Sequence, residues 1–192
     1  MKQLLVPILL LLFGPLLAQE PGRNCLTGEE QALGRLINEY RMEKHLPGIK
    51  LSASLCFVAR THSKDLSGTD VYKGKCNLHS WSDQGKWTAC CYTPDHKDAA
   101  CMWNKPRELT TYQGDGFEIA YFTTATFDTP EMLAREALKA WKGSPGHNEI
   151  IINSGKWADM DWKAMGVGSW NGYVTVWFGK ETDPAGEPEI CK

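Results

Sequence analysis

Cysteine content is the feature that most restricts how this 192-residue chain can fold. Four of its seven cysteines fall between residues 76 and 101, a stretch with little helical or strand periodicity that glycine and proline interrupt. A loop of this length inside a compact domain is usually functional, and Trp81 and Trp87 make it too aromatic for a disordered segment. We therefore predict a cysteine-stapled wall that presents His79 to partners from the rest of the chain.

Residues 1–18 are predicted to form a secretory signal peptide. Lys2 supplies the positive start, residues 4–13 form an apolar run broken only by one proline, and Ala18 closes a small-residue cleavage site. The run is too short for a transmembrane helix. We expect residues 19–192 to form a single domain that is secreted, either to the extracellular space or, if the source is bacterial, to the periplasm.

Charge and hydropathy narrow the set of partners. The formal net charge is −2, and removal of Lys2 with the signal peptide makes it −3. This balance argues against nucleic acid as a partner. Because no second apolar run follows, we expect a mature protein that does not span a membrane. We predict a monomer that binds an extracellular ligand.

Cysteines in an exported chain usually form disulfides, and an odd number leaves at least one unpaired thiol or an intermolecular bond. The sequence has no paired Cys-x-x-Cys spacing, which would have favoured a zinc site instead. Adjacent Cys90 and Cys91 point apart and should bond to different partners, for which Cys76 and Cys101 are the nearest candidates. Cys56, on a predicted helix, is the candidate free and buried thiol. The first and last cysteines of the mature chain could tie its termini together, so the disulfide candidates are Cys25, Cys76, Cys90, Cys91, Cys101 and Cys191.

Hydrophobic periodicity predicts four helices. The first starts at a capping-box pair, Thr27 and Glu30. His62 lies on the apolar stripe of the second helix, and we interpret it as a core histidine with one satisfied ring nitrogen. The helices follow caps at Thr27, at Ser52 or Ser54, at Thr129 and at Ser144, and they end near Leu46, Gly68, Gly143 and Ile152.

Alternating apolar residues predict the strands. Residues 117–122 form one, and residues 165–178 form a hairpin around Asn171-Gly172, the most favourable two-residue turn. Residues 109–112 could add a short strand, and the tail from about residue 181 is expected to be irregular. Gly166 and Gly168 in the hairpin suggest close backbone approach of a neighbour. Helices combined with antiparallel strands predict an α+β fold in which helices cover both faces of the sheet.

Two further residues are candidates for a site beside His79. Glu118 shares a strand face with apolar residues, and a carboxylate there needs a partner. It could be a surface acid at a strand edge, but we expect a functional or metal-facing role. His147 lies in the first turn of the short fourth helix, where the helix dipole favours neutral imidazole. Neutral imidazole is the form that binds a metal or accepts a proton. His96, in a polar loop, is interpreted as a plain surface histidine.

Four short motifs follow one another along residues 27–180. They are Asn38-x-x-Arg41 in the first helix, His79-Ser80, Trp141-x-x-Ser144-Pro145-Gly146-His147, and a Gly166-x-Gly168 strand followed by Asn171-Gly172-Tyr173. In this order and spacing they resemble the CAP superfamily of cysteine-rich secretory proteins, venom allergens, plant pathogenesis-related proteins and bacterial secreted relatives. The combination of Ser-Pro-Gly-His with a plain hairpin is closest to the bacterial branch.

The resemblance implies an α-β-α sandwich with a central antiparallel sheet flanked by helices, here stapled by disulfides. It also implies a surface cleft where two histidines and acids converge, which in several relatives can hold zinc or another divalent cation. His79 matches the first histidine, His147 the second, and Glu118 the first acid. No carboxylate occupies residues 141–144, where the family has its second acid.

We expect a secreted, non-catalytic CAP-domain binding module. Its cleft would hold zinc or another divalent cation on His79, Glu118 and His147, together with a lipid or sterol, a glycan or a protein ligand. Eight tryptophans are many for one domain, and some should line exposed grooves. The alternative is a secreted metal-dependent hydrolase, a peptidase or esterase, that uses the same cleft. The missing second acid favours binding, because a general base beside a metal-bound water is then hard to assign.

Overall fold

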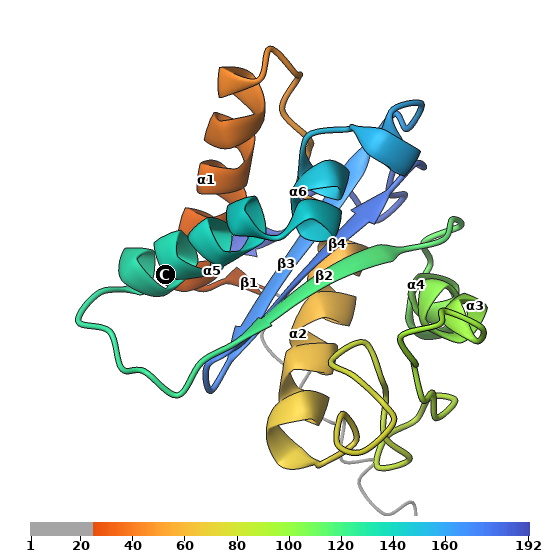
Figure 1. Cartoon of the computed structure of the whole chain (residues 1–192). Coiled ribbons are helices and arrows are strands. Elements are labelled where there is room, and N and C mark those ends of the chain that lie inside the picture. The colour runs from red at the N-terminus through yellow and green to blue at the C-terminus, as the bar shows by residue number, and fades with distance from the viewer. Residues whose placement is uncertain (1–24) are drawn as a thin grey trace, which may run out of the picture.

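The centre of the fold is a three-stranded antiparallel sheet. The computed structural model describes residues 25–192, so the predicted signal peptide lies outside the described residues. Strands β2 (Phe117–Phe122), β3 (Ala164–Trp170) and β4 (Tyr173–Gly179) lie in the order β2-β4-β3 (Figure 1). β3 and β4 form the predicted hairpin, with Asn171 and Gly172 both at positive φ in its turn. β2 is therefore an edge strand of this sheet.

Helices cover both faces of the sheet. α1 (Gly28–Glu43), α5 (Pro130–Gly143) and α6 (Pro145–Ile151) lie on one side, and α2 (Ala53–Gly68) lies on the other (Figure 1). Side chains of β4 alternate accordingly: Val176 and Phe178 pack with the first group of helices, and Trp177 packs with α2. The structure confirms the α+β class and the α-β-α sandwich.

The helix starts follow the predicted caps. Thr27 and Glu30 form the reciprocal capping box of α1. Ser52 rather than Ser54 caps α2, because the Ser52 hydroxyl accepts a hydrogen bond from the Leu55 amide at 2.9 Å. No helix within residues 25–192 combines the length and the apolar character that crossing a bilayer requires.

Helix α2 approaches the sheet unusually closely because β3 carries two glycines. A Cβ at Gly166 would lie 2.2 Å from the backbone carbonyl carbon of Leu55, and one at Gly168 would lie 2.3 Å from that of Ala59. A larger residue at either position would push the helix away from the strand. This contact confirms the predicted close approach at both glycines and brings His62, one turn further along α2, near the sheet.

The cysteine-rich stretch packs against α2 and the same face of the sheet. Trp81 is buried in that second core and pairs with Cys90 through an isolated β-bridge. Asp65 of α2 holds the loop, because its carboxylate accepts hydrogen bonds from the Ser82 amide at 2.8 Å and from the Ser82 hydroxyl. A buried carboxylate with two such donors is well satisfied. The loop is therefore an ordered wall, as predicted.

Three disulfides use all six candidate cysteines. Two staple the loop and one joins the ends of the described chain: Cys76–Cys91, Cys90–Cys101 and Cys25–Cys191. Cys56 is free and buried, as predicted. Burial raises the pKa of its thiol to about 12, so the unreactive protonated form prevails.

Three local expectations differ from the structure. Residues 109–112 do not form a strand, because Leu109 ends the short helix α4 (Lys105–Leu109), which has Pro106 in its first turn. Helix α3 (Ala99–Trp103) precedes it, and five residues are too few to show a helical period. The tail is not wholly irregular, since β5 (Glu189–Ile190) pairs in parallel with β1 (Cys25–Leu26).

Removing the Cys25–Cys191 disulfide should destabilise the fold more than removing Cys76–Cys91. The first bond spans a sequence separation of 166 and the second a separation of 15. In the chain-entropy model the restraint on the unfolded chain grows with loop length, to about 5 against about 3 kcal/mol. We expect urea unfolding of Cys25→Ser/Cys191→Ser to show the larger fall in unfolding free energy. A larger fall in Cys76→Ser/Cys91→Ser would contradict this expectation.

Candidate functional site

The three predicted site residues line one cavity of about 420 Å³. His79 comes from the cysteine-rich loop, Glu118 from the edge strand β2, and His147 from α6. They give the cavity a polar end. Its remaining wall is largely apolar and is formed by Met102, Trp103, Phe117, Ile119, Ile150 and Trp157. The cavity thus joins hydrogen-bonding groups to an aromatic and aliphatic surface.

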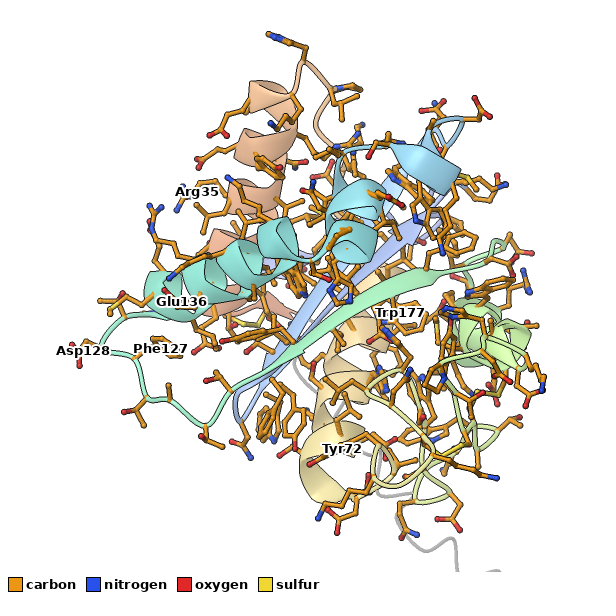
Figure 2. The ribbon with its side chains drawn as sticks, viewed as in Figure 1. Arg35, Tyr72, Phe127, Asp128, Glu136 and Trp177 are labelled. Atoms are coloured by element: carbon orange, nitrogen blue, oxygen red, sulfur yellow. A yellow bond between two sulfur atoms is a disulfide. The ribbon has the colours of Figure 1, made fainter. Side chains whose placement is uncertain are left out.

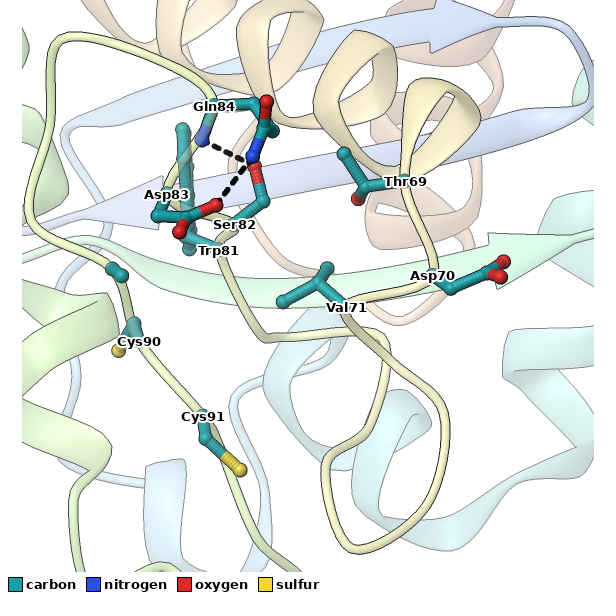
Figure 3. Close-up of a pocket in the computed structure, with 10 residues that line it drawn as sticks. Thr69, Asp70, Val71, Trp81, Ser82, Asp83, Gln84, Cys90 and Cys91 are labelled. Atoms are coloured by element: carbon teal, nitrogen blue, oxygen red, sulfur yellow. Dashed lines mark hydrogen bonds between the residues drawn. The ribbon is translucent and has the colours of Figure 1, made fainter.

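A second hollow of about 470 Å³ lies between the end of α2 and the cysteine-rich loop (Figure 3). Thr69, Asp70 and Val71 form one side, and Ser82 and Asp83 lie across from them. It contains no residue that the sequence singled out for chemistry. Its acids do not face a basic side chain within the hollow. We therefore place the candidate site in the cavity of His79, Glu118 and His147.

Glu118 is the most deeply buried member of the site. Its side chain has no exposed surface, and its two oxygens contact two different histidines: Oε1 lies 2.7 Å from Nδ1 of His62 and Oε2 lies 3.3 Å from Nδ1 of His79. Burial raises the pKa of the Glu118 carboxyl, but the charge and hydrogen bonds of the two histidines outweigh burial, so the pKa lies below its usual value. Glu118 is accordingly a carboxylate.

His62 has a larger part in the site than the sequence indicated. Its side chain is fully buried, as expected for a core histidine. Both of its ring nitrogens, however, have partners: Nδ1 faces Glu118, and Nε2 lies 2.9 Å from the Ser80 carbonyl oxygen. Sequence reasoning expected one satisfied nitrogen. The hydropathy pattern could not reveal the second contact, since it depends on where the loop returns to α2.

His147 is half-buried at the start of α6. Its pKa is lowered mainly by burial and further by the nearby His79, while Glu118 acts in the opposite direction. The neutral form that the sequence predicted is therefore favoured, but chiefly because of desolvation rather than the helix dipole.

The three predicted metal ligands do not fit a metal centre as they are placed. Glu118 has both oxygens engaged, and His79 turns Nδ1 toward it. Across residues 25–192, no three His, Cys, Asp or Glu side chains form a group that could hold an ion. Glu136 does not supply the missing acid, because it lies on α5 (Figure 2), pairs with Lys139 at 3.5 Å and does not line the cavity. The metal role stays a prediction from the sequence.

Sequence reasoning missed part of the cavity wall. Tyr92 and His96 come from the loop, where the Tyr92 hydroxyl lies 2.8 Å from Nδ1 of His96. Lys156 and Trp157 come from the 3₁₀ helix η1 (Gly155–Trp157). His96 is exposed, as predicted, and also lines the cavity. Only the tryptophan content hinted at these positions, because short loops and a three-residue helix carry no periodic signal.

A family model places this arrangement among known proteins. The model of the CAP family, described as the cysteine-rich secretory protein family, matches residues 35–156, which is more than half of the chain. The chain belongs to the CAP family. The match includes His79, Glu118 and His147, so all three candidate site residues lie within the CAP domain.

Two solved bacterial structures are similar to this chain. An extracellular protein containing an SCP domain from Bacillus anthracis superposes with a TM-score of 0.52 at 20% identity, over 80% of this chain and 41% of that one. A cysteine-rich secretory protein from Staphylococcus aureus gives a TM-score of 0.48 at 17% identity, over 80% of this chain and 38% of that one. This CAP protein thus spans about two fifths of either relative. The Bacillus anthracis structure supports the fold alone, and no curated protein matches the chain.

The pKa of His147 should lie below the ordinary histidine value of about 6.5. Burial is its main cause. A folded pKa below the unfolded one means that the unfolded chain takes up the proton first as pH falls. The stability that neutral His147 contributes is therefore fully present above about pH 6.5 and is lost below it.

NMR titration of the imidazole C–H signals measures the pKa of His147 directly. Urea unfolding above and below about pH 6.5 should show a smaller loss of stability on acidification in His147→Asn than in the wild type. His45→Asn is the matched control, because His45 is exposed and outside the cavity. A pKa at or above the ordinary value would refute the assignment.

Proposed function

We propose that this CAP protein is a secreted binding module that holds a small amphipathic, lipid-like molecule in the cavity of His79, Glu118 and His147, without turnover. The domain would comprise residues 19–192 after loss of a signal peptide at residues 1–18. Three disulfides support export, because such bonds persist in oxidising compartments. The observation that carries the proposal is one cavity with a polar end and an apolar wall.

The size and lining of the cavity favour an amphipathic small molecule over the other expected ligands. A volume of about 420 Å³ lies within the range of small-molecule sites. Trp103, Phe117 and Trp157 offer broad apolar contact. A glycan could stack a ring face on these aromatic side chains, but Met102, Ile119 and Ile150 would leave its hydroxyls unpaired. A folded protein partner would engage an outer surface instead. His79 and His147 supply the polar contacts that orient a ligand, and Glu118 lies behind His79.

The arrangement favours binding over hydrolysis. Glu118 is held by two histidines and is buried, so it cannot approach a substrate. None of the described residues that line the cavity is Ser, Thr or Cys, so none offers an alcohol or thiol nucleophile. Burial raises the pKa of the Tyr92 phenol, which disfavours its reactive anion. The metal-dependent hydrolase that the sequence left open lacks a fitting ligand set among the described residues. Binding without chemistry is what these contacts support.

Tryptophan fluorescence titrated with decanol, a single-chain amphiphile, tests the proposal. We expect saturable quenching, and about tenfold weaker affinity in Trp157→Ala, because part of the apolar wall is lost. Trp170→Ala is the matched control, since Trp170 is 46% exposed and lies outside the cavity. Equal losses in both variants, or no saturable binding by the wild type, would refute the proposed site.

Chelation distinguishes metal-free binding from binding that depends on a divalent cation. Decanol affinity should not change when the protein is dialysed against EDTA, because no described group of side chains fits an ion. Elemental analysis of the untreated protein accompanies the measurement. If EDTA abolished binding and zinc restored it, the ligand set predicted from the sequence would be correct and the metal-free cavity would be wrong.

A further inference from the structure

A groove beside helix α2 is distinct from the cavity of the candidate site. The hollow of about 470 Å³ between the end of α2 and the cysteine-rich loop adjoins another of about 400 Å³, because Thr69 and Gln84 line both. Each volume lies within the range of small-molecule sites. Neither hollow shares a lining residue with the cavity. We call the two adjoining hollows the α2 groove.

Polar side chains line both walls of the α2 groove. Helix α2 supplies Thr61 and Lys64, and the chain that follows it supplies Asp70. Across from Asp70, the cysteine-rich loop supplies Asp83 and Gln84 (Figure 3). A carboxylate only accepts hydrogen bonds and an ammonium only donates them, whereas an amide or a threonine hydroxyl does both. The groove therefore offers both donors and acceptors to one ligand.

Several of these groups have little part in holding the fold together. Within residues 25–192, the only partner of the Gln84 side-chain amide is its neighbour Asp83, at 2.6 Å between Nε2 and Oδ1. Both side chains are exposed and lie in a loop. Lys64 is exposed as well, and its Nζ lies 4.8 Å from the centroid of the Trp170 indole. These side chains keep hydrogen-bonding capacity for a ligand.

Trp87 gives the α2 groove a rigid aromatic surface. Its Nε1–H donates to the Ser82 carbonyl oxygen at 2.8 Å, and its ring meets the Trp81 ring edge-on at 5.2 Å between centroids. A Cβ at Gly85 would lie 2.1 Å from the Trp87 ring, so glycine is needed there. The ring is half-buried and lines the groove. Because these contacts fix the indole beforehand, a ligand pays little ordering entropy to pack against it.

This lining suits a neutral sugar better than other classes of ligand. Each sugar hydroxyl both donates and accepts hydrogen bonds, and the C–H face of a pyranose packs well on an aromatic ring. Three acids, Asp65, Asp70 and Asp83, line the groove against one cation, Lys64, which disfavours an anionic ligand. The walls are a helix and a loop outside the sheet, so they offer no sheet edge to an extended peptide.

We propose that the α2 groove is a second binding site, which takes a neutral oligosaccharide. Trp87 packs against a sugar ring, while Gln84, Asp83 and Lys64 bond to the sugar hydroxyls. This inference does not rest on the proposed function, because the groove and the cavity have no lining residue in common. With both sites, an exported protein holds its small molecule while it is attached to a glycan.

Saturation-transfer difference NMR of the full chain with cellotriose, maltotriose and triacetylchitotriose tests the proposal. We expect a saturable signal from at least one of these sugars. In Gln84→Ala the affinity should be about tenfold weaker, because the hydrogen bonds of the amide are lost. Gln113→Ala is the matched control, since Gln113 is also exposed, donates to the nearby Thr111 carbonyl oxygen at 2.7 Å and lies outside the groove.

A variant of the cavity separates the two sites. Trp157→Ala should leave sugar affinity unchanged, because Trp157 lines the cavity and not the groove. The proposal is overturned if none of the sugars gives a saturable signal, if Gln84→Ala and Gln113→Ala bind equally well, or if Trp157→Ala abolishes sugar binding. If Gln84→Ala does not fold, Lys64→Ala takes its place with the same expected loss. The decanol titration decides the proposed function separately.

Discussion

The contact on which the site depends is the buried one between His62 and Glu118. It joins helix α2 to the edge strand β2, and through the Ser80 carbonyl it also joins the cysteine-rich loop. A buried charge is tolerated only when it is paired and hydrogen-bonded, so these three elements must meet in one arrangement. Glu118 in turn orients the ring of His79 through the contact with its Nδ1. The polar end of the cavity is thus oriented by buried side chains that lie behind its lining residues.

That contact requires α2 to lie close against the sheet. Gly166 and Gly168 leave room for the helix backbone, and no other residue could do so without moving it. Asp65 of α2 accepts a hydrogen bond from the Ser82 amide and so keeps the cysteine-rich loop beside α2. Two disulfides then restrain the loop covalently. Close packing, hydrogen bonds and disulfides all act on the same wall, which explains how a segment with so little regular structure can form one side of a cavity.

The site could be predicted in part from the sequence. His79, Glu118 and His147 were identified from motif spacing and local patterns, and the structure brings all three to one cavity. Their roles as metal ligands remain predictions. The fold was predictable because caps, the Asn171-Gly172 turn and strand alternation act within a few residues. Lys156 and Trp157 were not, because their place in the wall depends on where η1 packs.

The sequence by itself determined the α+β sandwich, the six disulfide candidates, the free Cys56 and the close approach at the β3 glycines, because each follows from residue type or short-range periodicity. Only the tertiary structure decided the disulfide pairing and the partners of Glu118. Periodicity placed His62 in the core, yet its second acceptor is a carbonyl 18 residues away in the chain. A buried hydrogen-bonded pair of this kind exists only after distant elements have packed, since its stability comes from burial and mutual hydrogen bonding.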